Sequence, residues 1–255
     1  MIPLKSAEEI EAIARAGQII GKLLQEIPDR IRPGVTTGEL DAFTEDFIRG
    51  HEGAVPAFKG LYGFPASTCI SVNHEVVHGI PSDRRILEEG DLVSIDVGVL
   101  LDGWYADSAK TFPVGEIDAE AVRLLEVTER ALAAGIEQAV PGKRLGDVGH
   151  AIQTTAERAG FSVVRDLVGH GIGRKPHEDP QVPNVGRPGR GLRLQEGMVL
   201  AIEPMINEGT AEVRTLADRW TVVTRDRRRS AHFEHTVAVT QDGARILTLP
   251  PAPAA

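Results

Sequence analysis

The chain has 255 residues, 42% of them hydrophobic, which is enough to bury a substantial core within one large domain. Its formal net charge of -9 argues against a nucleic-acid partner bound through a basic field, although Arg225 to Arg229 form a short basic cluster. The single cysteine, Cys69, excludes an intramolecular disulfide framework and a thiolate zinc site, and it fits a reducing cytosol.

The first residues lead directly into a predicted helix. Ser6 and Glu9 form a capping box, in which each side chain accepts a hydrogen bond from the other residue's backbone N–H. No charged and then apolar leader precedes this helix, and no apolar run is long enough to span a bilayer. We therefore expect a soluble cytoplasmic protein that binds no membrane, and we expect residues 250–255 to form a frayed tail.

A pattern of helices followed by strands runs twice along the chain. Apolar residues recur at helical spacing after the capping box, and Thr36 with Glu39 opens a second helix. From Asp118 the pattern begins again. The segments predicted after the second helix are a loop at 50–65, a strand at 67–72, and helices near 119–138 and 146–158.

The segment from Asp91 to Phe112 has two apolar runs around Leu101-Asp102-Gly103, which predicts a β-hairpin. If the loop is 101–102, Asp96 faces Asp107 directly; if it is 102–103, Asp107 faces Gly98 and Asp96 is its diagonal neighbour. Both registers place the two carboxylates on one face. Carboxylates about 5–7 Å apart in an apolar hairpin repel each other, so a divalent cation between them is one interpretation. The alternative is that one Asp caps a turn or faces solvent.

Three short matches recur in the same order in the two parts of the chain. They pair 33–40 with 141–148, His78-Gly79-Ile80 with His170-Gly171-Ile172, and 89–96 with 196–203. We infer two pseudo-symmetric halves, each with two helices followed by a mostly antiparallel sheet. The N-terminal half is expected at about 4–115 and the C-terminal half at about 116–249, within a single domain over 1–255.

The repeat extends to the acids. It aligns Glu203 with Asp96, and it leaves Glu234, in a predicted strand at 231–239, as the counterpart of Asp107. Like-placed groups from two pseudo-symmetric halves converge on the axis between them. The resulting hypothesis is one site built from Asp96, Asp107, Glu203, Glu234 and the histidines His78 and His170.

Carboxylates with one imidazole offer hard oxygen ligands and one nitrogen, which suits Mn, Fe(II), Co or Zn. The charge of four acids calls for two divalent ions. Paired ions about 3.5–4 Å apart can activate a water and clamp an attacked carbonyl, so the predicted reaction is hydrolysis of an amide or related bond. The glycines around His170 are expected to allow the backbone a close approach to ligands. A lone histidine among glycines is usually structural, and His177 gains less support from the repeat than His170 does.

These segments resemble the type I methionine aminopeptidases, which have the pita-bread fold. The resemblance extends from about Leu4 to Leu249. It rests on residues 69–73, 78–81, 95–98, 107, 169–173, 177–178, 202–204 and 234–236. It implies an α+β fold in which two halves of helices and antiparallel sheet surround a central dinuclear metal site, as a single catalytic domain.

The resemblance also implies a role for each site residue. The ligands of two divalent ions would be Asp96, Asp107, His170, Glu203 and Glu234, with Asp107 and Glu234 touching both ions. Glu203 would shuttle the proton of the metal-bridged hydroxide that attacks the scissile carbonyl. His177 would hydrogen-bond the carbonyl or its oxyanion, and His78 would contact the amide nitrogen. Asn73 and Ser230 match positions that hold a monovalent cation in some relatives.

The pocket for the first substrate residue is where this chain departs from the family. The matching positions are Phe58, Phe64, Cys69, His78, His177 and Trp220. Leu61 stands where many relatives carry an aromatic residue, and Pro176 stands where a larger apolar residue is usual. We expect an apolar cleft of altered shape. The alternative for Phe64 and Trp220 is ordinary core packing.

The implied function is removal of the initiator methionine from nascent proteins, with preference for a small second residue, by a monomer that could contact the ribosome. One alternative is a Xaa-Pro aminopeptidase or dipeptidase of the same fold, which normally carries a long extra N-terminal domain. Another is a non-enzymatic binding module, which typically loses metal ligands. A first helix beginning at Ser6 counts against the former, and the retained ligand set counts against the latter.

Overall fold

The computed structural model describes residues 2–251, so residues 252–255 of the predicted tail lie outside the described part. The four predicted helices are confirmed, and each helix end that was predicted lies within one residue of the observed end. They are α1 (Ala7–Glu26), α2 (Thr37–Arg49), α3 (Ala119–Glu137) and α4 (Leu145–Arg158), with short 3-10 turns η1 (Ile27–Arg30) and η2 (Leu61–Gly63). None of the helices in the described part is long and apolar enough to cross a membrane.

Capping boxes start the first two helices as predicted. Ser6 Oγ accepts from the Glu9 N–H at 3.3 Å, and the Glu9 carboxylate accepts from the Ser6 N–H at 3.0 Å. Thr36 and Glu39 make the same exchange at 3.1 and 2.8 Å. These bonds satisfy backbone donors that a helix leaves unpaired at its first turn, which fixes where α1 and α2 begin.

The strands of the described residues form four sheets in which every pairing is antiparallel. The first holds β1 (Val55–Pro56), β2 (Thr68–Val72), β4 (Leu92–Leu101) and β5 (Trp104–Pro113). The second, in the order β15-β14-β9-β7-β8, holds β7 (Gly169–Gly171), β8 (Glu178–Val182), β9 (Val199–Ile202), β14 (His235–Thr240) and β15 (Gly243–Ile246). Two small sheets hold β6 (Ser162–Val163), β10 (Met205–Asn207) and β13 (Ser230–His232), and β3 (Glu75–Val77), β11 (Val213–Thr215) and β12 (Val222–Thr224).

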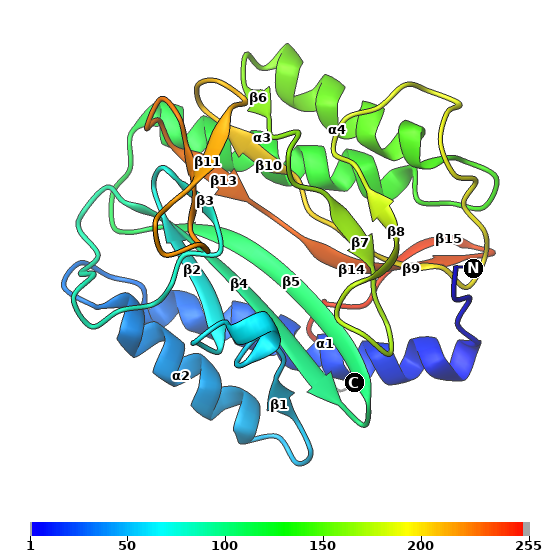
Figure 1. The fold of residues 1–255 in the computed structure, drawn as a ribbon, viewed down its shortest axis with the longest axis horizontal. Helices are drawn as coiled ribbons and strands as arrows, with labels where there is room; N and C mark the ends of the chain where they lie inside the picture. Colours follow the sequence, from blue (N-terminus) through cyan, green and yellow to red (C-terminus); the bar gives the residue numbers. More distant parts are fainter. Residues whose placement is uncertain (1, 252–255) are drawn as a thin grey trace.

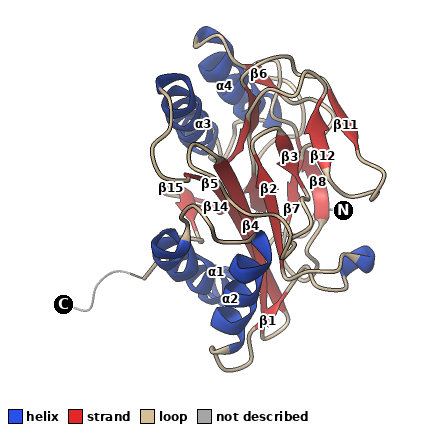
Figure 2. Ribbon diagram, turned by 90° about the vertical axis from the view of Figure 1, so that its left-hand side faces the viewer, coloured by secondary structure: helices blue, strands red, loops and turns tan. Residues whose placement is uncertain are grey.

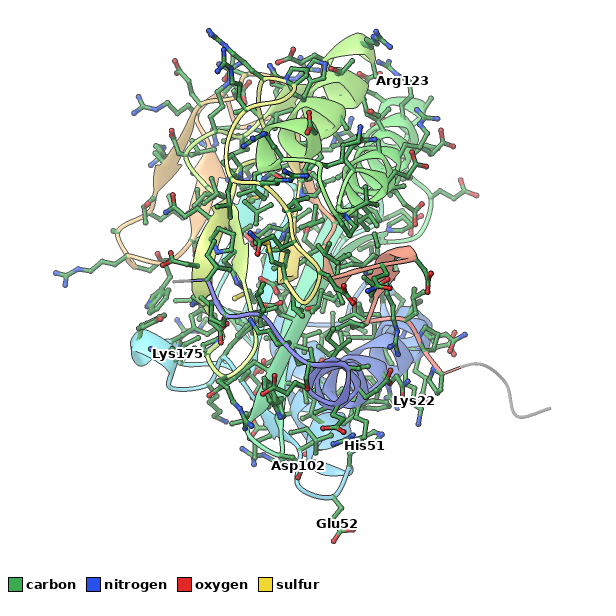
Figure 3. The ribbon with its side chains drawn as sticks, turned by 90° about the vertical axis from the view of Figure 1, so that its right-hand side faces the viewer. Lys22, His51, Glu52, Asp102, Arg123 and Lys175 are labelled. Atoms are coloured by element: carbon green, nitrogen blue, oxygen red, sulfur yellow. The ribbon has the colours of Figure 1, made fainter. Side chains whose placement is uncertain are left out.

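The hairpin β4–β5 adopts the second of the two expected registers. Gly98 faces Asp107, and the loop is Asp102-Gly103, with left-handed φ values of 51° and 77°. Two successive positive φ values match the twist of a tight hairpin. The tip at Asp102 lies at one end of the molecule (Figure 3), whereas Asp107, nearer the middle of the hairpin, is buried.

The prediction of one continuous strand at 231–239 is wrong. The structure has two strands there, β13 and β14, and Glu234 lies in the break between them. The cause is a change of partner, because the Glu234 N–H donates to the Ala109 carbonyl of β5 at 2.8 Å while β14 pairs with β9. The break carries Glu234 from one sheet to the other.

The two halves repeat the same backbone contacts, which confirms the predicted repeat. The Gly34 N–H donates to the Leu87 carbonyl at 2.8 Å just before α2, and the Gly142 N–H donates to the Leu194 carbonyl at 3.1 Å just before α4. Both glycines need the left-handed region, with φ of 91° and 90°. Figure 1 shows α1 and α2 below the strands, and α3 and α4 above them.

Figure 2 shows the long helices on one side of the sheets. Side-chain alternation sends the acids to the other side. On β4, Ile95, Val97 and Val99 belong to the core cluster that packs against α1. Asp96, between two of these residues, therefore points away from the helices. A second core cluster is built from α3, α4, β9 and β14.

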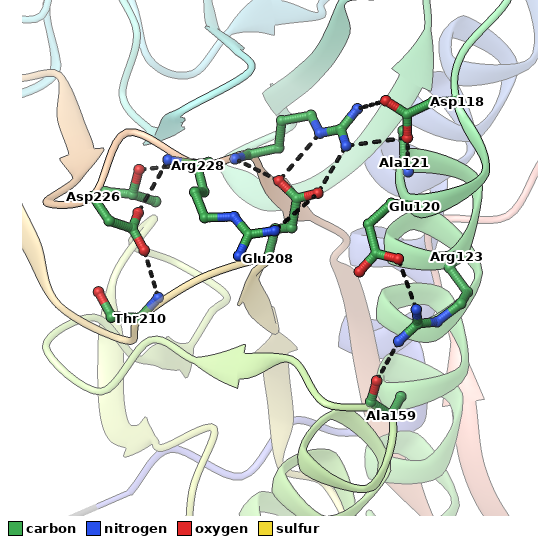
Figure 4. A network of polar contacts seen from close by, with 11 residues as sticks. Asp118, Glu120, Ala121, Arg123, Ala159, Glu208, Thr210, Asp226 and Arg228 are labelled. Atoms are coloured by element: carbon green, nitrogen blue, oxygen red, sulfur yellow. Dashed lines mark hydrogen bonds and ion pairs between the residues drawn. The ribbon is translucent and has the colours of Figure 1, made fainter.

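The basic cluster at 225–229 is partly tied into the fold. Arg229 donates to Glu208 at 2.7 Å and to Asp118, the N-cap of α3, at 2.7 Å. These bonds raise the pKa of Arg229 above its ordinary value. Figure 4 shows Asp118 and Glu208 within the network that joins α3 to the ends of β10 and β13.

Candidate metal centre

The structure brings the five predicted ligands to one cavity from both halves of the chain. Asp96 and Asp107 come from β4 and β5, His170 from β7, Glu203 from the end of β9, and Glu234 from the break after β13. Asp107, His170 and Glu234 each offer a ligand atom within 4.8 Å of the others. The Nε2 atom of His170 lies 3.5 Å from Asp107 Oδ2 and 3.6 Å from Glu203 Oε1.

Mutual repulsion among the acids fits a site for divalent cations. Burial raises the pKa values of Asp96, Glu203 and Glu234 well above the ordinary carboxyl range, and the charge of Asp107 raises each of them further. Burial also raises the pKa of Asp107, partly offset by His170. A cluster of buried like charges is stable only with protons or cations among them, and its oxygen and nitrogen donors suit divalent metals.

The orientation of His170 also fits metal binding. Its Nδ1 atom lies 2.9 Å from the carbonyl oxygen of Gly171, which can only accept, so Nδ1 carries a proton. In the neutral form of the ring, the lone pair of Nε2 faces the carboxylates of Asp107 and Glu203. A lone pair aimed at carboxylates is unfavourable unless a cation lies between them, whereas it is the arrangement that a metal-ligating histidine needs.

Thr236 is a site residue that the sequence reasoning did not single out. Its hydroxyl donates to the Asp107 carbonyl at 2.8 Å, lies 3.2 Å from Asp107 Oδ1, and accepts from the Asp107 N–H at 3.1 Å. The position two residues after Glu234 was the one available signal, because alternate residues of a strand share a face.

His232 was also missed. It is 1% exposed, and its Nε2 atom lies 3.7 Å from Glu203 Oε2. Neither ring nitrogen has a hydrogen-bond partner among the described residues. Burial lowers the pKa of His232 to about 3, with a smaller contribution from His78, so the ring beside Glu203 is neutral.

The glycines of the two His-Gly-Ile segments serve the sheets, whereas Gly169, before His170, lines the cavity. A Cβ on Gly171 would lie 2.2 Å from the Asp179 carbonyl oxygen, and a Cβ on Gly79 would lie 2.2 Å from that of Ile70. Both contacts are with neighbouring backbone rather than with the cavity. The glycine after each histidine therefore lets two backbone segments lie side by side while the histidine faces the site.

A cavity of about 1020 Å³ joins the acids to an apolar wall. The predicted pocket residues all line it: Phe58, Phe64, Cys69, His78, His177 and Trp220. Phe64 and Trp220 meet edge to face at 5.1 Å between ring centroids. Leu61 also lines the cavity, whereas Pro176 does not. Sequence reasoning missed the lining residues Val77, Leu167 and Met205, which read as ordinary core.

Gly98 makes room for one wall of this pocket. It lies on the same face of the hairpin as Asp96 and Asp107. A Cβ at this position would lie 2.6 Å from Cε1 of Phe58 and 3.0 Å from the Cβ of Ala57. The absence of a side chain at Gly98 therefore lets the Phe58 ring lie against the strand that carries Asp96.

Two histidines, His78 and His177, line the cavity together with the acids. His78 has a left-handed φ of 59° and meets Trp220 edge to face at 6.5 Å. His177 meets His170 edge to face at 4.5 Å. Burial lowers the pKa of His78, and partial burial lowers the pKa of His177 to about 4, with smaller contributions from the neighbouring imidazoles of His170 and His78. Both rings are therefore neutral at neutral pH and can donate one N–H each.

The loop that carries His177 is anchored by a buried ion pair. Lys5 Nζ lies 2.7 Å from Glu178 Oε2, with the two side chains 4% and 8% exposed. Glu178 also accepts from the N–H groups of Arg174 and Lys175 at 2.7 and 3.1 Å. The Lys5 N–H donates to the Gly197 carbonyl at 2.7 Å. The residue after His177 is thereby tied to the segment before α1.

Asn73 and Ser230, the predicted positions for a monovalent cation, lie together. The Ser230 N–H donates to the Asn73 carbonyl at 2.8 Å. Their side chains already have protein partners, because the Asn73 amide oxygen accepts from the Leu92 N–H at 2.9 Å and the Ser230 hydroxyl lies 2.8 Å from Asn207 Oδ1. The cation site stays a prediction.

Comparison with known proteins places this arrangement in a family. The model of "Metallopeptidase family M24" matches residues 11–241. A methionine aminopeptidase from Clostridium perfringens is 56% identical over 249 residues, which cover 98% of this chain and 99% of that protein. The crystal structure of methionine aminopeptidase from Rickettsia prowazekii has a TM-score of 0.95 and 46% identity, covering 98% of this chain and 100% of that chain. A prolidase from Pyrococcus furiosus has a TM-score of 0.77 and 27% identity, covering 97% of this chain and 66% of that chain. The chain belongs to metallopeptidase family M24.

Proposed function

We propose that this chain is a methionine aminopeptidase, a metal-dependent exopeptidase that removes N-terminal methionine from nascent polypeptides. The observation that supports this most is the cavity in which an apolar wall of Phe64, Cys69 and Trp220 adjoins the buried acids. An unbranched thioether side chain suits such a wall, and a charged side chain would lose its hydration there without a partner. The relatives that match over nearly their full length carry the same name.

The proposed cofactors are two divalent ions held by Asp96, Asp107, His170, Glu203 and Glu234. When bound, they would activate a water for attack and polarise the scissile carbonyl. Glu203 would accept the proton of the attacking water, a role that suits a carboxylate whose pKa burial has raised. The neutral rings of His177 and His78 would donate hydrogen bonds to the carbonyl oxygen and toward the amide. Which of Co, Mn, Fe or Zn serves is a matter for metal analysis of the purified protein.

We further propose that the single catalytic domain acts as a cytoplasmic monomer on chains emerging from the ribosome. The free amino group of the substrate would approach the acids, and the first side chain would enter the apolar wall. The second residue would pass His78 and His177, where a small side chain such as that of Gly, Ala or Ser fits best. Sedimentation of the purified protein tests the monomer, and co-sedimentation with ribosomes tests the contact.

A peptide panel tests the substrate. We expect kcat/KM to be highest for Met-Ala-Ser among Met-Ala-Ser, Leu-Ala-Ser, Met-Lys-Ser, Ala-Pro-Ser and N-acetyl-Met-Ala-Ser, measured with each divalent ion added to metal-free protein. A misfit in a hydrophobic pocket costs about 1–3 kcal/mol, so Leu-Ala-Ser should fall about tenfold or more. Fastest cleavage of Ala-Pro-Ser would favour a Xaa-Pro peptidase, and no cleavage by fully metallated protein would favour a binding module.

A further inference from the structure

Tyr62 has a conformation and an exposure that its local structure does not explain. It lies in η2 with a left-handed φ of 51°, and it is 73% exposed. A non-glycine residue in this region costs about 1–3 kcal/mol and persists only where the surrounding structure requires it. Gly60 and Gly63 on either side also have positive φ, of 86° and 89°. The turn is built to hold the Tyr62 side chain away from the core.

The exposed ring of Tyr62 lies on His177. The two rings stack with 5.8 Å between centroids and an interplanar angle of 19°. The Tyr62 hydroxyl lies 3.4 Å from Nδ1 of His177, and both residues line the mouth of the cavity. Figure 3 shows Lys175, from the loop that carries His177, at the side of the molecule. One aromatic ring, from a turn 115 residues away in the chain, therefore covers an imidazole at the mouth.

The hydroxyl contact bears on which nitrogen of His177 carries the proton. Where the Tyr62 hydroxyl donates to Nδ1, the imidazole carries its proton on Nε2. Nε2–H is then the donor that remains free to reach a substrate. His170 meets the same imidazole edge to face at 4.5 Å, so the ring has one aromatic contact from the turn η2 and one from the strand β7.

We propose that Tyr62 is a positioning residue for His177, with its ring fixing the plane of the imidazole and its hydroxyl fixing the Nε2–H tautomer. This inference rests on the proposed function, in which His177 donates to the substrate carbonyl. The neighbouring residue also supports this proposal. Leu61 supplies no aromatic ring to the pocket, but the same turn places the aromatic ring of Tyr62 at the mouth of the cavity. The chain thus uses a strained and exposed residue for the reaction rather than for stability.

The test compares Tyr62→Phe, which keeps the ring, with Tyr62→Gly, which removes it and relieves the backbone strain. We expect kcat for Met-Ala-Ser to fall about tenfold in Tyr62→Phe, the effect of one lost hydrogen bond, with little change in KM. We expect a fall of about 10- to 100-fold in Tyr62→Gly, with a Tm equal to or above that of the wild type. The matched control is Ile86→Ala, which removes an exposed apolar side chain (53% exposed) that does not line the cavity and should leave kcat unchanged.

A spectroscopic measurement keeps the inference separate from the choice of substrate. The ¹⁵N shifts of His177 in the zinc-loaded protein should show the Nε2–H tautomer in the wild type and a mixture of tautomers in Tyr62→Phe. If the wild type cleaved no methionine peptide, the proposed function would fail while this comparison still tested the contact. Wild-type kcat in both variants, an unchanged tautomer in Tyr62→Phe, or a marked loss of Tm in Tyr62→Gly would each overturn the role.

Discussion

The side chain of Thr236 holds the backbone of Asp107 in place. The Thr236 hydroxyl satisfies both the N–H and the carbonyl of Asp107 and lies within 3.2 Å of its carboxylate. Thr236 is fully buried, so water cannot replace these bonds. The hydroxyl therefore controls the backbone from which a carboxylate of the candidate metal centre projects.

Replacing Thr236 with valine keeps the shape and removes the hydroxyl. We expect Thr236→Val to lower the free energy of unfolding by about 1–3 kcal/mol, because the Asp107 N–H is left buried without an acceptor. We also expect metal affinity to fall about 10- to 100-fold. Urea unfolding and metal titration by calorimetry measure the two effects.

Thr44→Val is the matched control for that substitution. Thr44 is fully buried, and its hydroxyl has no partner among the described residues, so its loss should be neutral or stabilising. Thr236→Ser, which keeps the hydroxyl, should retain most of the metal affinity. Equal metal affinity in Thr236→Val and the wild type would show that the contact does not support the site.

The four acids could be predicted from the sequence because the repeat and the alternation of side chains along a strand are both visible within short segments. Asp96 and Asp107 share a face in either hairpin register, and Glu203 follows from its alignment with Asp96. The contact between Thr236 and Asp107 spans 129 residues and depends on how two sheets pack. No local pattern encodes such a contact, so Thr236 and His232 were not predicted.

At the scale of elements, the hairpin β4–β5 shapes the pocket as well as the metal centre. Gly98 lies on the face that carries the acids, and the Phe58 ring occupies the space that a side chain there would take. A single strand thus presents Asp96 to the candidate metal centre and a gap to the pocket. The two functions of the strand are set by alternate positions on one face.

Gly98→Ala should reshape the pocket without unfolding the hairpin. The new Cβ would meet the Phe58 ring, which can move, and would lie 3.0 Å from the Cβ of Ala57, which needs to shift by only a few tenths of an ångström, so we expect little loss of Tm. We expect kcat/KM for Met-Ala-Ser to fall about tenfold, since a methylene-scale misfit is worth about 1–3 kcal/mol. Steady-state kinetics with wild type and variant measure the change.

The cause can be checked by removing the ring that the new Cβ would meet. In a Phe58→Ala background, adding Gly98→Ala should change kcat/KM much less than it does alone. Gly50→Ala, at the end of α2 with an ordinary φ of -67°, is the control for adding a methyl elsewhere. An additive loss in the double variant would show that Gly98 acts by another route.

The interruption of the predicted strand at Glu234 shows where element prediction fails. Residues 231–239 have the composition of one continuous strand, and the sequence carries no glycine or proline to mark a stop. The strand ends because Glu234 pairs with Ala109 of β5, which is a property of sheet packing. Helix starts were predicted well because capping boxes are local.

At the scale of the whole molecule, each half contributes acids to one buried cluster. Asp96 and Asp107 come from the first half, and Glu203 and Glu234 from the second. An acid whose pKa is higher in the folded protein than in the unfolded chain binds more protons when folded. The free energy of unfolding of the metal-free protein should therefore fall as the pH rises from the ordinary carboxyl pKa of about 4 toward the raised values.

Divalent ions should reverse this trend because they bind the ionised ligands. We expect the rise in Tm on adding Mn²⁺ to metal-free protein to be larger at about pH 8 than at about pH 6. Thermal unfolding with and without the metal measures it. Asp96→Asn should reduce the pH dependence, and Asp226→Asn, outside the site, should keep it. A metal-induced rise in Tm that is the same at both pH values would contradict the ionised ligand set.

The ion pair between Lys5 and Glu178 makes activity depend on the order of the chain ahead of α1. Residues 2–6 have no helix or strand of their own, so this segment can open while the four sheets stay intact. On warming, the loop that holds His177 should then become mobile before the molecule melts, and turnover should fail at a lower temperature than circular dichroism reports for unfolding. Lys5→Met should widen that temperature gap, and a tag fused ahead of Pro3 should be judged by its effect on turnover rather than by its effect on folding.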